Sequence, residues 1–184
     1  MKKIIFVSHC ILNTASKVEL YNQEEIESEE ALRLLFVKKA LDKGIQFVQL
    51  PCPEFLMYGA IRWGHVSDQF DNPFFRQRVC ESLQSFLYQL QEYLAHPDKF
   101  CVLGIVGIDG SPSCGVKYTC TGKGWGGDFS GRCDLDQVLS SVRLVNHPGV
   151  FIEELQKMLG QNNIDIPIVG LFANEPDRIL SLLD

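Results

Sequence analysis

The sequence lacks any apolar run long enough to cross a bilayer. Its longest runs, such as residues 4–7, have the length of a strand, whereas a membrane helix needs roughly 20 apolar residues. Lys2 and Lys3 precede the first of these runs, but Ser8 and His9 end it before it reaches the length of a signal-peptide core. The sequence therefore predicts a cytoplasmic protein that has no membrane partner.

Clustered positive charge is also missing, because no run of basic residues is longer than a pair. The chain has a net charge of −6 and an isoelectric point near 5.2. Affinity for nucleic acid depends on grouped Lys and Arg side chains that neutralise phosphates. These features disfavour a nucleic-acid partner and favour a small-molecule substrate, and they give no indication of oligomeric state.

Closely spaced cysteine pairs are absent, yet the chain contains seven cysteines: Cys10, Cys52, Cys80, Cys101, Cys114, Cys120 and Cys133. An odd number of cysteines without an export signal is a poor basis for disulfides. In a reducing compartment, several cysteines indicate metal binding or catalysis, although single buried cysteines are also common as small apolar side chains. Their positions in the fold decide between these interpretations.

The pattern of apolar residues predicts one α/β domain spanning residues 1–184. Nearly continuous apolar runs, typical of parallel strands covered on both faces, occur at 3–8, 45–50, 100–108 and 166–172. Helical periodicity lies between them, at 24–43, 73–95, 149–159 and 175–183. This order predicts a Rossmann-like open, mostly parallel sheet with helices on both faces.

Two further expectations concern the first helix and a long loop. In the first helix, an apolar stripe is expected from Leu32, Leu35, Ala40 and Leu41. After the third strand, residues 109–148 are rich in Gly, Ser, Thr and Cys and predict little regular structure apart from a short helix near 135–144. Loops of this length in compact domains are usually functional.

Three of the cysteines, Cys10, Cys52 and Cys114, each follow a predicted strand. Ligands in open parallel sheets bind beyond the carboxyl ends of the strands, so these thiols are expected at one edge. Cys80 and Cys101 fall elsewhere and are expected to be structural. Three converging thiolates suit a soft metal centre, and 4Fe-4S clusters usually have four cysteine ligands. A cluster with three would keep one iron open, and such an iron would accept sulfur.

Three short motifs carry a family resemblance between residues 7 and 115. They are Val7-Ser8-His9-Cys10, Cys52-Pro53-Glu54 and Gly110-Ser111-Pro112-Ser113-Cys114-Gly115. In order and position they resemble the 2-thiouracil desulfurase family. The resemblance implies a 4Fe-4S cluster held by three cysteines, with one open iron that accepts the sulfur of a small thiocarbonyl-type substrate.

The same resemblance implies roles for individual residues. Cys10, Cys52 and Cys114 would be the cluster ligands. Glu54 would shuttle protons and activate water, and Ser111 would position or polarise the substrate. These assignments fit general acid–base chemistry beside a desolvated centre. The alternatives are an exposed loop carboxylate at Glu54 and turn hydroxyls that bond their own backbone.

Two segments depart from the usual pattern of that family. Residues 11–17 replace the segments that typically follow the first cysteine, and residues 55–59 replace a Gly- and Pro-rich continuation. Both segments are expected to line the substrate pocket. The candidate pocket residues in and after them are Asn13, Tyr58, Arg62 and His65.

Other chemistries remain open for these cysteines. Cys52, Cys114, Cys120 and Cys133 could form a structural zinc site, although zinc sites usually contain a tight cysteine pair. Cys114 could instead be the nucleophile of a cysteine hydrolase with a histidine base, either His9 or His147. A cluster scaffold or sulfur carrier is a non-enzymatic alternative.

The segment Gly122–Gly127 matches the Gly-x-Gly-x-x-Gly pattern. A dinucleotide site needs a strand directly before this pattern and a helix directly after it, and the sequence predicts neither here. We therefore expect a flap whose Trp125 closes over the pocket. His147-Pro148-Gly149 and Asn174-Glu175-Pro176 are expected to begin and cap helices.

Overall fold

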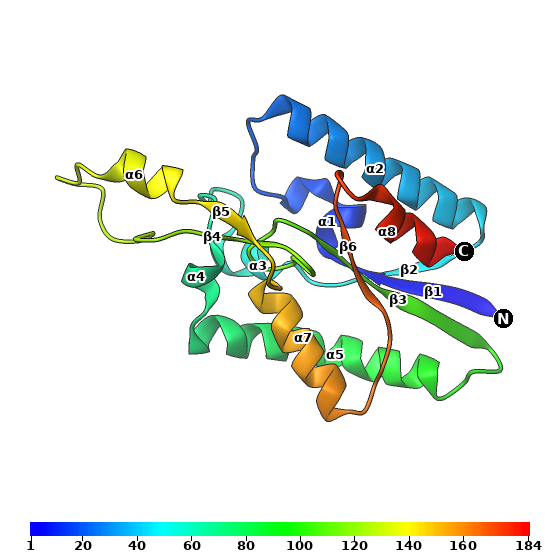
Figure 1. Ribbon diagram of the computed structural model, residues 1–184. Coiled ribbons are helices and arrows are strands. Elements are labelled where there is room, and N and C mark those ends of the chain that lie inside the picture. Colours follow the sequence, from blue (N-terminus) through cyan, green and yellow to red (C-terminus); the bar gives the residue numbers. More distant parts are fainter.

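A four-stranded parallel sheet forms the centre of the protein, as the computed structural model of residues 1–184 shows (Figure 1). All three strand pairs are parallel. In spatial order the strands are β2 (Gln46–Gln49), β1 (Lys2–Val7), β3 (Phe100–Ile108) and β6 (Ile168–Leu171). This architecture confirms the predicted α/β fold, and the four predicted strands are present with ends shifted by no more than two residues.

Helices cover both faces of the sheet and bury two separate cores (Figure 1). One face is covered by α5 (Pro73–Leu94) and α7 (Val150–Gln161). The other face is covered by α2 (Gln23–Asp42) and α8 (Pro176–Leu180), which ends in a 3₁₀ turn, η2 (Ser181–Leu183). Burying apolar strand residues on both faces explains why the strands are nearly continuous apolar runs.

Short helices occupy the connections at the carboxyl end of the sheet. They are α1 (His9–Leu12), the 3₁₀ turn η1 (Thr14–Ser16), α3 (Pro53–Tyr58) and α4 (Ser67–Phe70). No helix in the structure combines the length and the apolar character needed to span a membrane.

The strand order reverses between β1 and β3. The chain runs from β1 to β2 on one side and then crosses to β3 on the other side of β1. In open α/β sheets, ligands bind in the crevice beyond the carboxyl ends of the strands at such a reversal. The topology therefore points to a binding site formed by the connections after β1 and β3.

The apolar stripe of α2 differs from the expected one. Leu32, Phe36 and Ala40 are buried at spacings of four residues, whereas Leu35 and Leu41 are 42% and 59% exposed. The prediction of Leu35 and Leu41 was wrong because Phe36 fixes a stripe on a different side of the helix. A spacing of four residues keeps side chains on one helix face.

The long loop after β3 contains more structure than predicted. Two short antiparallel strands, β4 (Thr119–Thr121) and β5 (Arg143–Val145), form a second sheet, and α6 (Leu135–Ser140) lies between them. Figure 1 shows that this excursion projects from the main body. Three-residue strands are too short for sequence periodicity to reveal them.

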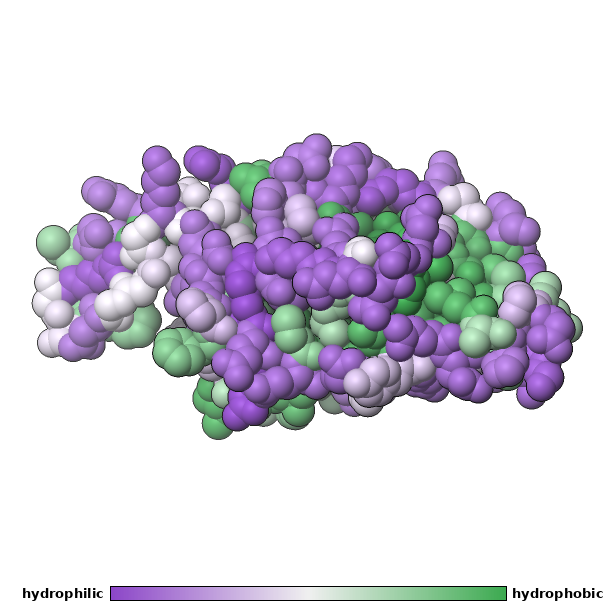
Figure 2. Space-filling view, turned by 90° about the horizontal axis from the view of Figure 1, so that it is seen from below, coloured by the Kyte–Doolittle hydropathy of each residue, from purple (hydrophilic) through white to green (hydrophobic).

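The side of the molecule formed by α5 and α7 is mostly hydrophilic, but Figure 2 shows a broad apolar area on it. Several apolar side chains next to this core are only partly buried: Phe100, Val102, Ile164, Ile166 and Ile168. The two helices therefore leave part of the apolar layer near the surface.

Candidate functional site

A cavity of about 560 Å³ lies at the carboxyl end of the sheet. Its wall includes residues that follow each of the four strands: Ser8 after β1, Cys52 after β2, Asp109 after β3 and Phe172 after β6. Its volume lies within the range of small-molecule sites. The cavity thus occupies the position that the strand reversal indicates.

The structure brings Cys10, Cys52 and Cys114 to this one cavity. Cys10 lies in α1, and its Sγ is 3.8 Å from Ser16 Oγ. Cys52 is the N-cap of α3, where its Sγ accepts the Phe55 N–H at 3.4 Å. Cys114 is buried in the loop after β3. Three segments far apart in sequence therefore supply thiols to a common space.

The three thiols differ in acidity. Interaction with the Cys52 thiol, followed by burial, raises the pKa of Cys10, while the same interaction lowers the pKa of Cys52 to about 7 against the effect of burial. Burial raises the pKa of Cys114 to about 12, although the Ser113 hydroxyl opposes this. Cys52 is therefore the most acidic of the three thiols.

Glu54 lies in the first turn of α3 and is 8% exposed. Its Oε1 accepts a hydrogen bond of 2.6 Å from the Ser113 hydroxyl. Its Oε2 lies 3.5 Å from Nε of Arg62, whose side chain is 3% exposed. The alternative of a solvent-exposed loop carboxylate is therefore excluded, and Glu54 is a buried, paired carboxylate on the cavity wall.

The two serines of the Cys114 motif have different environments. The Ser111 hydroxyl accepts the backbone N–H groups of Ser113 and Cys114 at 3.3 and 3.0 Å, as a turn hydroxyl does. The Ser113 hydroxyl instead lies between the Glu54 carboxylate and Cys114 Sγ, which is 3.5 Å away. Sequence reasoning assigned the substrate role to Ser111 and missed Ser113, because only the fold reveals the contact with Glu54.

A buried carboxylate, Asp109, shapes the loop that carries Cys114. Its Oδ1 accepts the backbone N–H groups of Val116, Lys117 and Tyr118, and its Oδ2 accepts a 2.9 Å bond from Arg178 of α8. Four donors around one carboxylate fix the loop in a tight turn. Sequence reasoning also missed Asp109. Its position directly after β3 could have indicated a place at the site, because sites in such sheets lie beyond the carboxyl ends of the strands.

The same loop is hydrogen-bonded to the first turn of α7. The backbone N–H groups of Val150 and Phe151 donate to the carbonyls of Pro112 and Ser113 at 3.2 and 3.0 Å. The N-cap, Gly149, makes no side-chain cap, and a Cβ there would lie 2.5 Å from the Ser113 carbonyl oxygen. The expected cap before α7 is therefore supplied by loop carbonyls, which satisfy the free N–H groups of the first turn.

Comparison with known proteins identifies one relative along nearly the whole chain. The chain is 31% identical to the uncharacterized protein MJ0003 of Methanocaldococcus jannaschii over 176 residues, which cover 96% of this chain and 90% of that protein. This chain belongs to the MJ0003 family. No family model and no solved structure matches it. Because the name MJ0003 carries no activity, function in this family has to be argued from the site.

Of the four pocket candidates in this MJ0003-family chain, two line the cavity and two do not. Arg62 and His65 are on its wall. The Asn13 side chain instead caps η1 by accepting the Ala15 N–H, and the Tyr58 ring packs against the His65 ring in a tilted arrangement, with 4.8 Å between centroids. Asn13 and Tyr58 are both exposed and lie outside the cavity wall.

The other four cysteines differ in whether they line the cavity. Cys120 lines the cavity, whereas Cys133 is exposed and lies outside it. Cys80 donates to Glu154 between α5 and α7, and Cys101 is at the start of β3. The structure contains no group of three or more His, Cys, Asp or Glu side chains arranged to hold a metal ion. Of the four cysteines in the zinc alternative, Cys133 lies apart from the other three.

The glycine-rich segment is not part of the cavity wall. β4 directly precedes Gly122, so the expectation of no strand before this segment was wrong, but the next helix begins only at Leu135. The arrangement still lacks the strand–turn–helix context of a dinucleotide site. Trp125, the expected lid, does not line the cavity.

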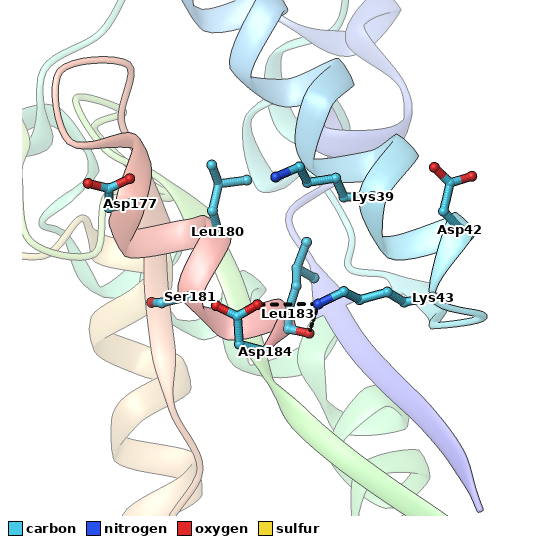
Figure 3. Close-up of a pocket in the computed structure, with 8 residues that line it drawn as sticks. All are labelled: Lys39, Asp42, Lys43, Asp177, Leu180, Ser181, Leu183 and Asp184. Carbon is cyan, nitrogen blue, oxygen red and sulfur yellow. Dashed lines mark hydrogen bonds and ion pairs between the residues drawn. The ribbon is translucent and has the colours of Figure 1, made fainter.

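A second hollow of about 500 Å³ lies between the end of α2 and the segment from α8 to Asp184 (Figure 3). Figure 3 shows Lys43 pairing with the Leu183 carbonyl and the Asp184 carboxylate across it. Its wall contains no thiol, histidine or aromatic ring. The hollow therefore has none of the groups that carry chemistry in the cysteine cavity.

Proposed function

We propose that this chain is a cytoplasmic iron–sulfur-dependent desulfidase that removes sulfur from a small thiolated compound. The supporting observation is that the thiols of Cys10, Cys52 and Cys114 line one cavity together with the buried carboxylate of Glu54. Three soft donors and a proton-transfer group in one enclosed space are what this chemistry requires.

The donor set fits a 4Fe-4S cluster. Two of the three thiols are hard to ionise alone, and a bound cationic centre supplies the charge that keeps such thiols deprotonated. When bound through Cys10, Cys52 and Cys114, the cluster would supply one open coordination position for sulfur.

The residues of the chain would carry the protons of the reaction. The net change is hydrolytic and redox-neutral: C=S and water become C=O and hydrogen sulfide. Glu54 would take a proton from water at its carboxylate and return it to the departing sulfide. The Ser113 hydroxyl orients Oε1, and the Arg62 guanidinium beside Oε2 balances the carboxylate charge.

The cysteine count and acidic surface support the choice of compartment and partner. The chain has seven cysteines, an odd number that makes a poor disulfide framework and favours a reducing compartment. The net charge of −6 favours a small substrate over nucleic acid. A cysteine hydrolase has less support, because burial holds the pKa of Cys114 near 12 and its thiol would stay protonated at neutral pH.

Anaerobic reconstitution tests the cluster. The purified chain should take up iron and sulfide and gain the broad visible absorption of a 4Fe-4S centre. Cys10→Ala, Cys52→Ala and Cys114→Ala should each lose iron, whereas Cys80→Ala, a matched thiol outside the cavity, should retain it. A colourless protein that binds stoichiometric zinc in place of iron would refute the proposal.

Loss of the carboxylate tests catalysis separately from cluster binding. Glu54→Gln keeps the size and polarity of the side chain but cannot accept a proton from water. Iron content and the visible spectrum should match the unmodified protein, and sulfide release from thiocarbonyl compounds should stop. Continued release at the original rate would remove Glu54 from the mechanism.

A further inference from the structure

Three buried side-chain nitrogen or oxygen atoms in the structure have no hydrogen-bond partner: Ser8 Oγ, Arg62 Nε and His65 Nδ1. All three residues line the cysteine cavity. Buried polar groups in proteins are almost always paired, so an unpaired one needs an explanation. All three atoms belong to residues of one cavity wall, which points to a ligand in that cavity as the source of the missing partners.

Arg62 is fixed in place by its other nitrogens. Its Nη1 donates to the Gly59 carbonyl at 3.1 Å, and its Nη2 donates to the Ser16 carbonyl at 2.8 Å. Only Nε remains, at 3.5 Å from Glu54 Oε2, beyond the usual length of a hydrogen bond. The guanidinium therefore keeps its Nε–H for another acceptor.

His65 packs against a cluster of aromatic rings. Its ring centroid lies 4.8 Å from Tyr58 and 4.9 Å from Phe70, and Phe70 stacks on Phe75 at 4.2 Å. Burial lowers the pKa of His65, so the ring is neutral at neutral pH. A neutral imidazole offers Nδ1 as a single donor or acceptor, depending on its tautomer.

The cavity has no uncompensated positive charge. Its two basic wall residues are already paired, Arg62 with Glu54 and Lys17 with Glu29. Glu25 adds another carboxylate to the wall. A phosphate or carboxylate on the ligand would meet no free cation, and burying an unpaired charge is costly. The unpaired atoms therefore suit an uncharged polar group.

We propose that Arg62 and His65 form a recognition subsite that hydrogen-bonds an uncharged polar group of the substrate, with His65 as a specificity-determining residue. That the ligand of this subsite is a substrate rests on the proposed desulfidase function. The structural part of the proposal, that Nδ1 of His65 has no hydrogen-bond partner within the protein, does not depend on that function.

The stability of His65→Phe tests the structural part. Phenylalanine preserves a ring packed against Tyr58 and Phe70 but removes the unpaired nitrogen. The thermal midpoint of the full-length protein, at matched iron content, should rise by about 2–4 °C, because an unsatisfied buried polar atom is lost. A fall in the midpoint would show that Nδ1 has a structural partner and would overturn the subsite. His96→Phe, at a half-exposed histidine after α5, is the matched control.

Substrate kinetics test the recognition part, with 2-thiouracil as the probe because it names the family that the motifs resemble. In His65→Phe, the KM for sulfide release should rise by about 3- to 10-fold, the effect of one neutral hydrogen bond, with little change in kcat. An unchanged KM would overturn the subsite. The phosphate-bearing counterpart, 2-thiouridine 5′-monophosphate, should be the poorer substrate, and equal turnover would refute the uncharged group.

The thermal midpoint and the substrate kinetics distinguish failure of the desulfidase proposal from failure of the subsite proposal. If the chain takes up no iron and releases no sulfide, the desulfidase proposal falls, and the change in midpoint still decides whether Nδ1 is unpaired. If the unmodified chain releases sulfide but His65→Phe behaves like His96→Phe, the desulfidase stands and the subsite falls.

Discussion

The Ser113 hydroxyl donates a 2.6 Å hydrogen bond to Glu54 Oε1 and so joins two segments that are 59 residues apart in the sequence. Both side chains are buried. Ser113 precedes Cys114, and Glu54 follows Cys52 by two residues. One hydrogen bond therefore couples the positions of two candidate ligands to the orientation of the candidate acid–base group.

Under the proposed desulfidase function, Ser113→Ala should slow sulfide release without loss of the cluster. The variant leaves Oε1 of Glu54 without its donor, so the carboxylate loses its fixed orientation, and sulfide release should fall roughly 10-fold, the effect of about 1.4 kcal/mol. Iron content should stay unchanged. Ser140→Ala, in the exposed part of α6, is the control. Loss of iron in Ser113→Ala would instead indicate that the hydroxyl supports Cys114 directly.

Asp109→Asn should destabilise the whole domain. The Asp109 side chain is fully buried, accepts three backbone N–H groups and pairs with Arg178, and disrupting such a buried acceptor typically costs about 1–3 kcal/mol. Urea unfolding followed by circular dichroism measures this cost. Asp98→Asn, at an exposed position before β3, should have almost no effect. Equal stabilities of the two variants would refute the structural role of Asp109.

Two glycine substitutions should have opposite effects. A Cβ at Gly170 in β6 would lie 2.4 Å from the Asp109 carboxylate, so Gly170→Ala should destabilise the protein by about 1–3 kcal/mol through overpacking. Gly160 lies in α7 with open space around it, and Gly160→Ala should stabilise the helix by up to about 1 kcal/mol. The urea midpoints of the two variants should move apart.

The ionic network between α5 and α7 predicts a dependence of stability on pH. Burial alone would raise the pKa of Glu154, but hydrogen bonds from Lys157 and Arg76 outweigh it and hold the pKa below its ordinary value of 4.5. The ionised carboxylate therefore stabilises the fold above pH 4.5, and this contribution is lost as the pH falls through the lowered value.

Glu154→Gln should accordingly unfold at a lower temperature than the unmodified protein at neutral pH. Its thermal midpoint should fall less steeply on acidification below pH 4.5, because the ionised carboxylate is already gone. Glu81→Gln, on the exposed side of α5, should keep the steeper profile. Parallel profiles for all three proteins would exclude Glu154 as a source of the acid sensitivity.

Periodicity predicted the main sheet and the long helices because each buries a continuous apolar surface. β3 coincides with its predicted range, and α5 begins at the predicted Pro73. Sequence reasoning also placed Cys10, Cys52 and Cys114 at one sheet edge, since parallel strands deliver their carboxyl ends to a common side. These predictions depend on local pattern and topology alone.

The contacts inside the site could not be predicted in the same way. Ser113, Asp109 and the pairing of Glu54 with Arg62 depend on which loops meet, and those meetings involve side chains far apart in the sequence. Ser111 and Ser113 have the same chemistry, and only the turn geometry sends one hydroxyl to the backbone and the other to the carboxylate.

The link between Asp109 and Arg178 also sets the order in which the protein can mature. Arg178 is synthesised 69 residues after Asp109, and α7, whose first turn holds the Pro112 and Ser113 carbonyls, also emerges later than the loop. While the ribosome is still completing these segments, the turn that carries Cys114 has neither anchor. Under the proposed function, insertion of the cluster in the cell should therefore follow translation of residue 178 rather than accompany the synthesis of the thiol-bearing segments.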